Sequence, residues 1–236
     1  YWNDVLSLRK KNVLVSFGSV MKCYVIPIKY RRSILKTLAR FPDVTFIWKY
    51  EKLDDDFAVN EVGKVKNIVL SKWIPQNDLL GDPRVTAFIS HAGAGSMQET
   101  SSKGVPALFI PLFGDQPRNA AMLEGIGAGL AFDKFKMADD EEFTKSVRQL
   151  LETESLGVNA RRVAKMWASR PYAPKDLLLR HVEFAAKFGP VENMTPKGIQ
   201  LSFLQYYFLD VIAIAFVVLI LCSYEESEDF VICMSA

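Results

Sequence analysis

The stretch "FISHAGAGSMQE", residues 88–99, joins an apolar β-branched run to a histidine, a turn of small residues and a helical segment. The run that leads into it, "VTAFISH" (85–91), has the composition of a buried strand, and "PALFIPL" (106–112) is strand-like again. A strand, a helix and a second strand in close succession are typical of a parallel β-α-β unit. The small residues of the turn suit a backbone that must come very close to another group.

The same alternation continues on both sides of this unit. Strand-like runs occur at 11–19, 44–50, 67–73 and 129–134, and helical patterns at 30–41, 96–103, 116–127, 139–152 and 176–188. Because the strands are continuously apolar, we predict an α/β fold with a parallel sheet covered by helices on both faces. Such sheets bind ligands at the carboxyl ends of their strands, where Ser16, His91 and the loop before Asp115 lie.

Composition excludes several classes of protein. The 236 residues include 29 basic and 27 acidic side chains, for a net charge of +2, and the basic residues form no stripe of the kind that binds nucleic acid. The three cysteines are far apart and show neither metal-ligand spacing nor a disulfide framework. The first strand is not followed by G-x-G-x-x-G, which argues against a dinucleotide-binding dehydrogenase.

The turn after His91 is a candidate phosphate site. A glycine-rich turn that leads into a helix presents free N–H groups and a partial positive charge, and Gly93 and Gly95 permit a close approach. His91 can donate a hydrogen bond to the same anion. The structural alternative is a capping box, in which Ser96 and Glu99 satisfy the first N–H groups of the helix.

Two further loops carry groups that suit a nucleotide sugar. The segment "KWIPQNDLLGDP" contains Trp73, which can stack on a flat base, and Gln76, which can read the edge of that base. The alternative for Trp73 is to cover the edge of the core. Asp115 and Gln116 stand side by side and together supply acceptors and donors for vicinal sugar hydroxyls. Helix capping is the alternative there, although Asp115 alone would be enough for it.

These motifs together resemble a known family. The 29-residue stretch "FISHAGAGSMQETSSKGVPALFIPLFGDQ" resembles the signature of the UDP-glycosyltransferases, and specifically of the membrane-bound UDP-glucuronosyltransferases of animals. The segments "VLVSFGS", "FIWKYE", "WIPQNDLLGDP" and "LDVIAIAFVVL" resemble the family in the expected order. The resemblance extends to about Tyr224 and implies the C-terminal domain of a GT-B glycosyltransferase, in which two Rossmann-like domains face each other across a cleft.

The resemblance also implies a role for each candidate residue. Trp73 would stack on uracil, Gln76 would bond its edge or the ribose, and Glu99 would accept hydrogen bonds from the ribose hydroxyls. The remaining candidates would hold the diphosphate (Ser16, His91, Gly93, Gly95 and Ser96) or the transferred sugar (Asp115 and Gln116). Many relatives carry Asn where this chain has Gly95, so an amide side chain is missing at that point.

The implied reaction is transfer of a sugar, glucuronic acid by resemblance, from a UDP-sugar to a small lipophilic hydroxyl. In-line geometry and charge stabilisation on the departing diphosphate would supply much of the rate. In the family the catalytic base is a histidine of the N-terminal domain, and His181, in the middle of a predicted helix, does not match it. We therefore expect no catalytic residue, no metal and no cofactor in this chain, the UDP-sugar being a substrate.

The C-terminal part is expected to enter a membrane. The run Phe203–Tyr224 is almost wholly apolar over 22 residues, and as a helix it would extend about 33 Å, enough for a bilayer core. The alternative is a buried or partner-docking helix. We predict a donor-binding domain at 1–170, a helix and linker at 171–200, the span at 203–224 and a short tail at 225–236.

The resemblance places the globular part in the lumen of the endoplasmic reticulum, although Lys187 and Lys197 favour the opposite orientation by the positive-inside rule. Because the sequence begins at Tyr1, we expect it to be a piece of a longer protein. The expected partners are the donor, an acceptor held by the N-terminal domain, the membrane and related chains in an oligomer. A different class of function is a non-catalytic, membrane-anchored partner that regulates full-length relatives.

Overall fold

The computed structural model describes residues 1–190 and 195–234, with side chains through Tyr224 except Cys222. By contacts the chain divides into two units, Tyr1–Pro171 and Tyr172–Ala236. The first unit contains the whole β-sheet. Residues 191–194 of the predicted linker and the last two residues of the predicted tail lie outside the described part of the chain.

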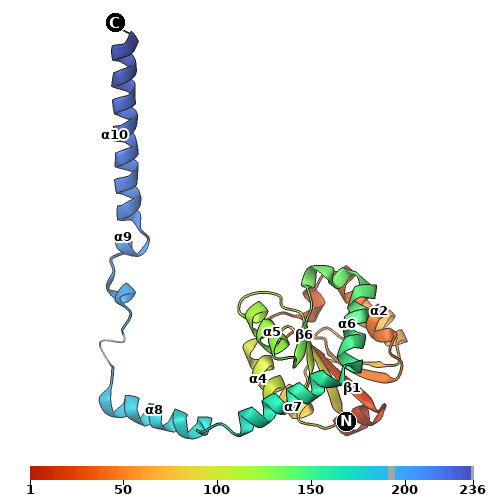
Figure 1. Cartoon of the computed structure of the whole chain (residues 1–236). Coiled ribbons are helices and arrows are strands. Elements are labelled where there is room, and N and C mark those ends of the chain that lie inside the picture. The colour runs from red at the N-terminus through yellow and green to blue at the C-terminus, as the bar shows by residue number, and fades with distance from the viewer. Residues whose placement is uncertain (191–194, 235–236) are drawn as a thin grey trace. The chain divides into compact units, whose positions relative to one another are not determined.

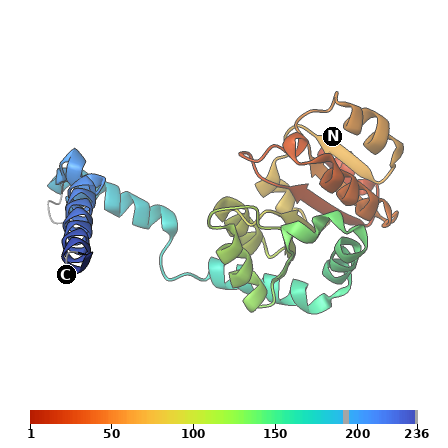
Figure 2. The same cartoon turned by 90° about the horizontal axis from the view of Figure 1, so that it is seen from above.

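The first unit is built on a six-stranded parallel sheet with the order β3-β2-β1-β4-β5-β6. The strands are β1 (Lys11–Ser16), β2 (Val44–Lys49), β3 (Ile68–Ser71), β4 (Val85–Ser90), β5 (Ala107–Phe109) and β6 (Gly129–Ala131). Each lies within a run that the sequence predicted to be a strand. Figure 2 shows the red and orange first half of this unit beside its yellow and green second half. The parallel, Rossmann-like sheet is confirmed.

Helices connect successive strands. The first unit contains α1 (Trp2–Ser7), α2 (Ile28–Ala39), α3 (Gln76–Leu80), α4 (Ala94–Lys103), α5 (Gln116–Gly125), α6 (Asp140–Glu152) and α7 (Glu154–Ala168). The second contains α8 (Pro174–Phe188), α9 (Phe203–Tyr206) and α10 (Leu209–Met234). Short 3-10 helices occur at Cys23–Val25, Val62–Lys64, Lys134–Ala138 and Lys197–Gln200, and a π-helical turn at Phe57–Glu61.

The sheet is buried on both faces. Neighbouring residues of a strand point to opposite sides, so each strand contributes side chains to two cores. Val13 and Val15 of β1 join a core that includes residues of α2 and α6. Leu14, between them, joins a second core with residues of α1, α3, α5 and α7. Figure 1 shows α2 and α6 on one side of the sheet and α4 and α5 on the other. The predicted covering of both faces is confirmed.

Helix α6 illustrates how the sequence specifies one of these elements. The Asp139 carboxylate accepts hydrogen bonds from the backbone N–H groups of Glu141 and Glu142, at 3.0 and 3.1 Å, and so caps the helix. Phe143 and Val147, one helical turn apart, both point into the core. The acidic first turn also complements the positive end of the helix dipole.

The expected membrane span has a different structure. The sequence predicted one helix over Phe203–Tyr224, whereas α9 ends at Tyr206 and α10 begins at Leu209. Phe208, between them, has a φ of 57°, a left-handed conformation that a continuous α-helix does not contain. Within residues 1–190 and 195–234, no helix is both long and apolar enough to cross a membrane. The predicted span is therefore not supported.

Sheet packing at Gly129 supplies a test of the fold. A Cβ at Gly129 would lie 2.6 Å from Cε2 of Phe109 and 2.7 Å from the Ala107 carbonyl oxygen, whereas one at Gly125 would meet nothing within 4 Å. We expect Gly129→Ala to lower the free energy of unfolding by about 1–3 kcal/mol through overpacking. Urea unfolding followed by tryptophan fluorescence measures it. Gly125→Ala is the matched control and should not lower the free energy of unfolding. Equal losses for the two variants would show that the close contact at Gly129 is not the cause of the destabilisation.

Candidate functional site

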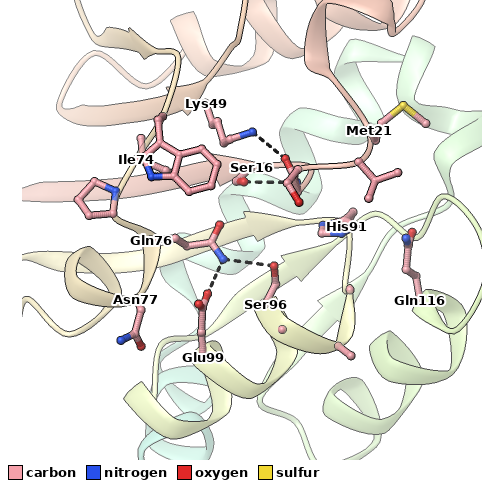
Figure 3. Close-up of a pocket in the computed structure, with 18 of the residues that line it drawn as sticks. Ser16, Met21, Lys49, Ile74, Gln76, Asn77, His91, Ser96, Glu99 and Gln116 are labelled. Atoms are coloured by element: carbon pink, nitrogen blue, oxygen red, sulfur yellow. Dashed lines mark hydrogen bonds between the residues drawn. The ribbon is translucent and has the colours of Figure 1, made fainter.

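A cleft of about 550 Å³ opens at the carboxyl ends of the central strands. It lies where the sheet order reverses, because β1 pairs with β2 on one side and β4 on the other, and ligands of such sheets bind at this point. Figure 3 shows the side chains that converge there. All predicted site residues except Asp115 line the cleft: Ser16, Trp73, Gln76, His91, Gly93, Gly95, Ser96, Glu99 and Gln116.

A tight turn carries the chain from β4 into α4. Ala92 is buried and has a φ of 63°, which is uncommon for a residue with a Cβ. Its carbonyl accepts a hydrogen bond of 3.0 Å from Nδ2 of Asn119, and its N–H donates to Oγ of Ser90 at 3.4 Å. Such a conformation costs on the order of 1–3 kcal/mol and persists only where the surroundings impose it. The turn is thus a fixed feature of the cleft.

The imidazole of His91 packs against two glycines. A Cβ on Gly18 would lie 2.7 Å from its Nε2, and a Cβ on Gly93 would lie 2.5 Å from the same atom. Neither position can therefore carry a side chain while the ring stays in place. The sequence predicted that Gly93 gives a ligand room, but the group it accommodates is the imidazole. A Cβ at Gly95 would meet nothing within 4 Å, so space for a ligand exists there.

The surroundings of His91 favour the neutral form of its imidazole. Burial lowers the pKa of its imidazole, an effect that the Asp115 carboxylate and the Ser16 backbone oppose and the Lys49 ammonium reinforces. The buried Nδ1 makes no hydrogen bond within the described part of the chain. A neutral imidazole has one N–H to donate, so His91 can serve an anion as a hydrogen-bond donor rather than as a positive charge.

The N-terminus of α4 faces the cleft without a side-chain cap. The helix begins at Ala94 and its N-cap residue is Gly93, which makes no side-chain cap. The capping box considered for Ser96 and Glu99 is therefore wrong, because Ser96 is the third helical residue. The N–H groups of the first turn have no intrahelical acceptor, and together with the helix dipole they form a site that favours an anion.

Three polar side chains on one wall of the cleft bind one another. The amide Nε2 of Gln76, at the start of α3, donates to Oε2 of Glu99 at 2.5 Å and to Oγ of Ser96 at 3.3 Å. Gln76 thus bridges α3 and α4. Both acceptors line the cleft, and a carboxylate and a hydroxyl oxygen can accept hydrogen bonds from hydroxyl groups.

Trp73 stands at the entrance of the cleft, in the loop between β3 and α3. Its side chain is 68% exposed, so the alternative in which it covers the core edge is wrong. Oγ of Ser71 donates a hydrogen bond of 2.7 Å to the Trp73 carbonyl, which fixes the backbone of the loop. An exposed indole beside a polar cleft is a platform for a flat ring.

Asp115 and Gln116 do not act as an equivalent pair. Asp115 is the N-cap residue of α5 but makes no side-chain cap, and its Oδ2 accepts from Nδ2 of Asn119 at 2.6 Å. Oε1 of Gln116 accepts from the backbone N–H groups of Leu112 and Phe113, at 2.8 and 3.1 Å. Gln116 lines the cleft, whereas Asp115 is not among the lining residues. The amide group of Gln116 that remains for a ligand is therefore its NH2.

Sequence reasoning missed Lys49, Gly18 and Asn119. Lys49 ends the apolar run "VTFIWK", and a single charge at the carboxyl end of a buried strand was the signal for it. Gly18 lines the cleft and has a φ of 91°, a conformation that favours glycine. Asn119 bonds both Ala92 and Asp115, a link that only the folded chain makes visible.

The described residues contain no group of three or more His, Cys, Asp or Glu side chains that could hold a metal ion. His181 lies in α8 of the second unit, where its Nδ1 is 2.8 Å from the Leu177 carbonyl oxygen. Burial raises the pKa of the Cys23 thiol to about 12, so this cysteine is not a nucleophile near neutral pH.

The packing of His91 gives a matched pair of variants. Gly93→Ala places a Cβ 2.5 Å from Nε2 of His91, whereas Gly95→Ala adds one in open space. We expect Gly93→Ala to shift the imidazole ¹H and ¹⁵N signals of His91 and to lower the free energy of unfolding by about 1–3 kcal/mol. Gly95→Ala should leave the His91 signals unchanged and should not lower the free energy of unfolding, because Gly95 lies within α4, where alanine is tolerated. Undisturbed His91 signals in the Gly93 variant would show that the imidazole does not depend on this glycine.

The sequence of this chain is similar to those of mammalian UDP-glucuronosyltransferases. Mouse (Mus musculus) UDP-glucuronosyltransferase 1A9 is 34% identical over 221 residues, which are 90% of this chain and 40% of the mouse protein. Rat (Rattus norvegicus) UDP-glucuronosyltransferase 1A8 is 35% identical over 201 residues, 85% of this chain and 36% of that protein. This chain thus spans about 40% of the length of such relatives.

Two solved structures share the fold. The rice (O. sativa) protein Os79 in complex with UDP has a TM-score of 0.67 at 23% identity, over 80% of this chain and 43% of that one. UGT71G1 of Medicago truncatula, complexed with UDP-glucose, has a TM-score of 0.58 at 23% identity, over 69% of this chain and 37% of that one. The sequence model of the family described as UDP-glucoronosyl and UDP-glucosyl transferase matches residues 7–235. With most of its length matched, the chain belongs to this UDP-glycosyltransferase family.

Proposed function

We propose that this chain is the donor-binding half of a glycosyltransferase and that its cleft holds a UDP-sugar. The observation that carries the proposal is the uncapped N-terminus of α4, which opens into a cleft with an exposed indole at its entrance. A nucleoside diphosphate has the complementary groups, a flat base at one end and an anion at the other.

The base and the ribose would occupy the wall between Trp73 and α4. The exposed indole of Trp73 supplies a stacking surface for uracil. The carboxylate of Glu99 is an acceptor for the two adjacent ribose hydroxyls, and Gln76 already holds it in place with a bond of 2.5 Å. A ribose that binds here would compete with Gln76 or share Glu99 with it.

The diphosphate would be held mainly by neutral donors. Among the described residues that line the cleft, Lys49 is the one cationic side chain, whereas Asp78 and Glu99 are acidic. The Lys49 ammonium is in turn paired with Glu51 at 2.8 Å. The favourable field for phosphate must therefore come from the N–H groups and dipole of α4, with His91 and Ser16 as further donors. Open space at Gly95 lets the phosphates reach that helix.

The transferred sugar would lie beside Gln116. Its NH2 group is the free donor at that end of the cleft, since its carbonyl oxygen is engaged by Leu112 and Phe113. Asp115 would contribute only if its bond to Asn119 exchanged for a sugar hydroxyl. We propose glucuronic acid as the sugar because the mammalian relatives named above are UDP-glucuronosyltransferases.

Transfer itself would need groups beyond this cleft. An inverting displacement requires a base for the acceptor hydroxyl, and His91 sits on the phosphate side of the site, packed between two glycines. We propose that the base and the lipophilic acceptor pocket belong to another domain of the transferase. The cleft then contributes donor orientation and stabilisation of the departing diphosphate. Location in the endoplasmic reticulum and assembly with related chains stay predictions.

Calorimetric titration with UDP and with uridine tests the proposal. The chain should bind UDP, and Trp73→Ala should weaken both ligands by about 1–3 kcal/mol, the usual value of base stacking on an aromatic ring. His91→Ala should weaken UDP more than uridine, because its expected partner is a phosphate. The chain alone should transfer no sugar to an acceptor.

Matched controls lie outside the cleft. Trp167→Ala in α7 and His181→Ala in α8 remove the same residue types and should leave both affinities unchanged. Failure of the chain to bind UDP would overturn the donor-binding function. Equal weakening of UDP and uridine by His91→Ala would remove His91 from the phosphate site.

The sugar end is tested by Gln116→Glu rather than by truncation to Ala. A glutamate keeps an oxygen for the N–H groups of Leu112 and Phe113 but removes the NH2 donor. We expect UDP affinity to stay within about twofold and UDP-glucuronic acid affinity to fall about tenfold, the value of one hydrogen bond made by a buried polar group. Titrations with UDP, UDP-glucuronic acid and UDP-glucose measure this. If the affinity for UDP fell by the same factor as the affinity for UDP-glucuronic acid, Gln116 would serve the structure of the turn and not the sugar.

A further inference from the structure

Lys49 is an unusual residue in this cleft. It is the last residue of β2, and only 5% of its surface is exposed, although its ammonium is charged. Nζ donates to the Gly18 carbonyl at 2.8 Å and to Oε1 of Glu51 at 2.8 Å. An ammonium has three N–H donors, so two are already used within the protein. Burying a charge is costly unless the charge is paired and hydrogen-bonded, as the Lys49 ammonium is.

Glu51 extends the contact to the other end of the same loop. Its Oε1 binds Lys49, and its Oε2 accepts a hydrogen bond of 2.7 Å from the backbone N–H of Cys23. The loop that follows β1 is therefore held at Gly18 by the lysine and at Cys23 by the glutamate. Gly18 is also the residue that packs against the His91 imidazole.

Lys49 also contacts the base platform. Its Nζ lies 5.5 Å from the centroid of the Trp73 ring, within the range of a cation–π interaction. Trp73 is otherwise exposed, and the bond from Ser71 holds its backbone. The ammonium is thus a contact that restrains the ring itself.

We propose that Lys49, paired with Glu51, is a positioning residue that fixes the Trp73 ring and the Gly18 end of the β1 loop for nucleotide binding. The inference rests on the proposed function, since it assumes that the base stacks on Trp73. The Lys49 ammonium then binds groups of the protein rather than the phosphates, because Glu51 lies 2.8 Å from it and neutralises its charge. Lys49 then acts on the base and on the phosphate donors through Trp73 and Gly18.

The distinction between positioning and direct phosphate contact is measurable. If Lys49 positions Trp73 and the Gly18 end of the β1 loop, Lys49→Met should weaken uridine about five- to tenfold, as expected for partial loss of base stacking, and should weaken UDP by at least the same factor. Lys49→Arg keeps a cation and should restore most of the affinity. Lys52→Met removes an exposed lysine three residues further on and should have no effect. Weakening of UDP alone would overturn the positioning role in favour of a phosphate contact.

Readouts that do not need a ligand separate this inference from the proposed function. In the ligand-free chain, Lys49→Met should shift the Trp73 indole N–H signal, and Glu51→Gln should speed amide exchange at Cys23. If Lys49→Met unfolds because Glu51 is left unpaired, the double variant Lys49→Met/Glu51→Gln removes both charges and takes its place. An unmoved Trp73 signal overturns the inference even where UDP binds. A shifted Trp73 signal in a chain that does not bind UDP supports the positioning role of Lys49 and rejects the proposed function.

Discussion

The closest packing constraint in the cleft is the imidazole of His91 between two backbone segments that cannot carry a side chain. Gly18 follows β1 and Gly93 follows β4, and these two strands are neighbours in the sheet. Parallel pairing brings both loops to the same edge, so the ring can touch both at once. The left-handed conformation of Ala92 then directs the chain into α4. The position of the helix N-terminus, and with it the anion site, depends on this contact.

The electrostatic character of the cleft follows from that arrangement. Burial lowers the pKa of the His91 imidazole and so favours its neutral form, and Glu51 pairs with the ammonium of Lys49. Attraction for an anion is therefore left to fixed backbone dipoles, which need no counter-ion and no side-chain reordering. A site of this kind would restrict the position of an anion more strictly than a cluster of flexible cations would.

The sequence predicted the sheet well because its strands are buried on both faces. Such strands are continuous apolar runs, which can be recognised without knowing which strands are neighbours. Helix α7 was missed, since Leu156 and Ala160 are its only buried residues among those described and the apolar stripe is weak. The helix predicted over Phe203–Tyr224 is interrupted at Phe208, because composition carries no signal for a left-handed residue inside an apolar run. Local pattern also misplaced the start of α4, where Gly93 rather than Ser96 is the N-cap.

The candidate site was predictable as a set of residues but not as a network. Residue type and spacing pointed to Trp73 and Glu99. The sequence did not indicate that the side-chain carbonyl oxygen of Gln116 accepts hydrogen bonds from the backbone of its own turn. Lys49 and Asn119 were missed for the same reason, because their partners lie far along the chain. Hydrogen bonds between distant segments are set by the fold, and a single sequence carries little trace of them.

The bond between Gln76 and Glu99 has a consequence for selectivity. In the ligand-free cleft the carboxylate already has a partner at 2.5 Å, so an incoming hydroxyl group exchanges with an existing bond rather than adding a new one. Exchange contributes little net free energy, whereas a ligand that displaces the amide without offering a hydroxyl leaves a carboxylate unpaired. This wall of the cleft would therefore act less as a source of affinity than as a filter against molecules that lack the hydroxyl.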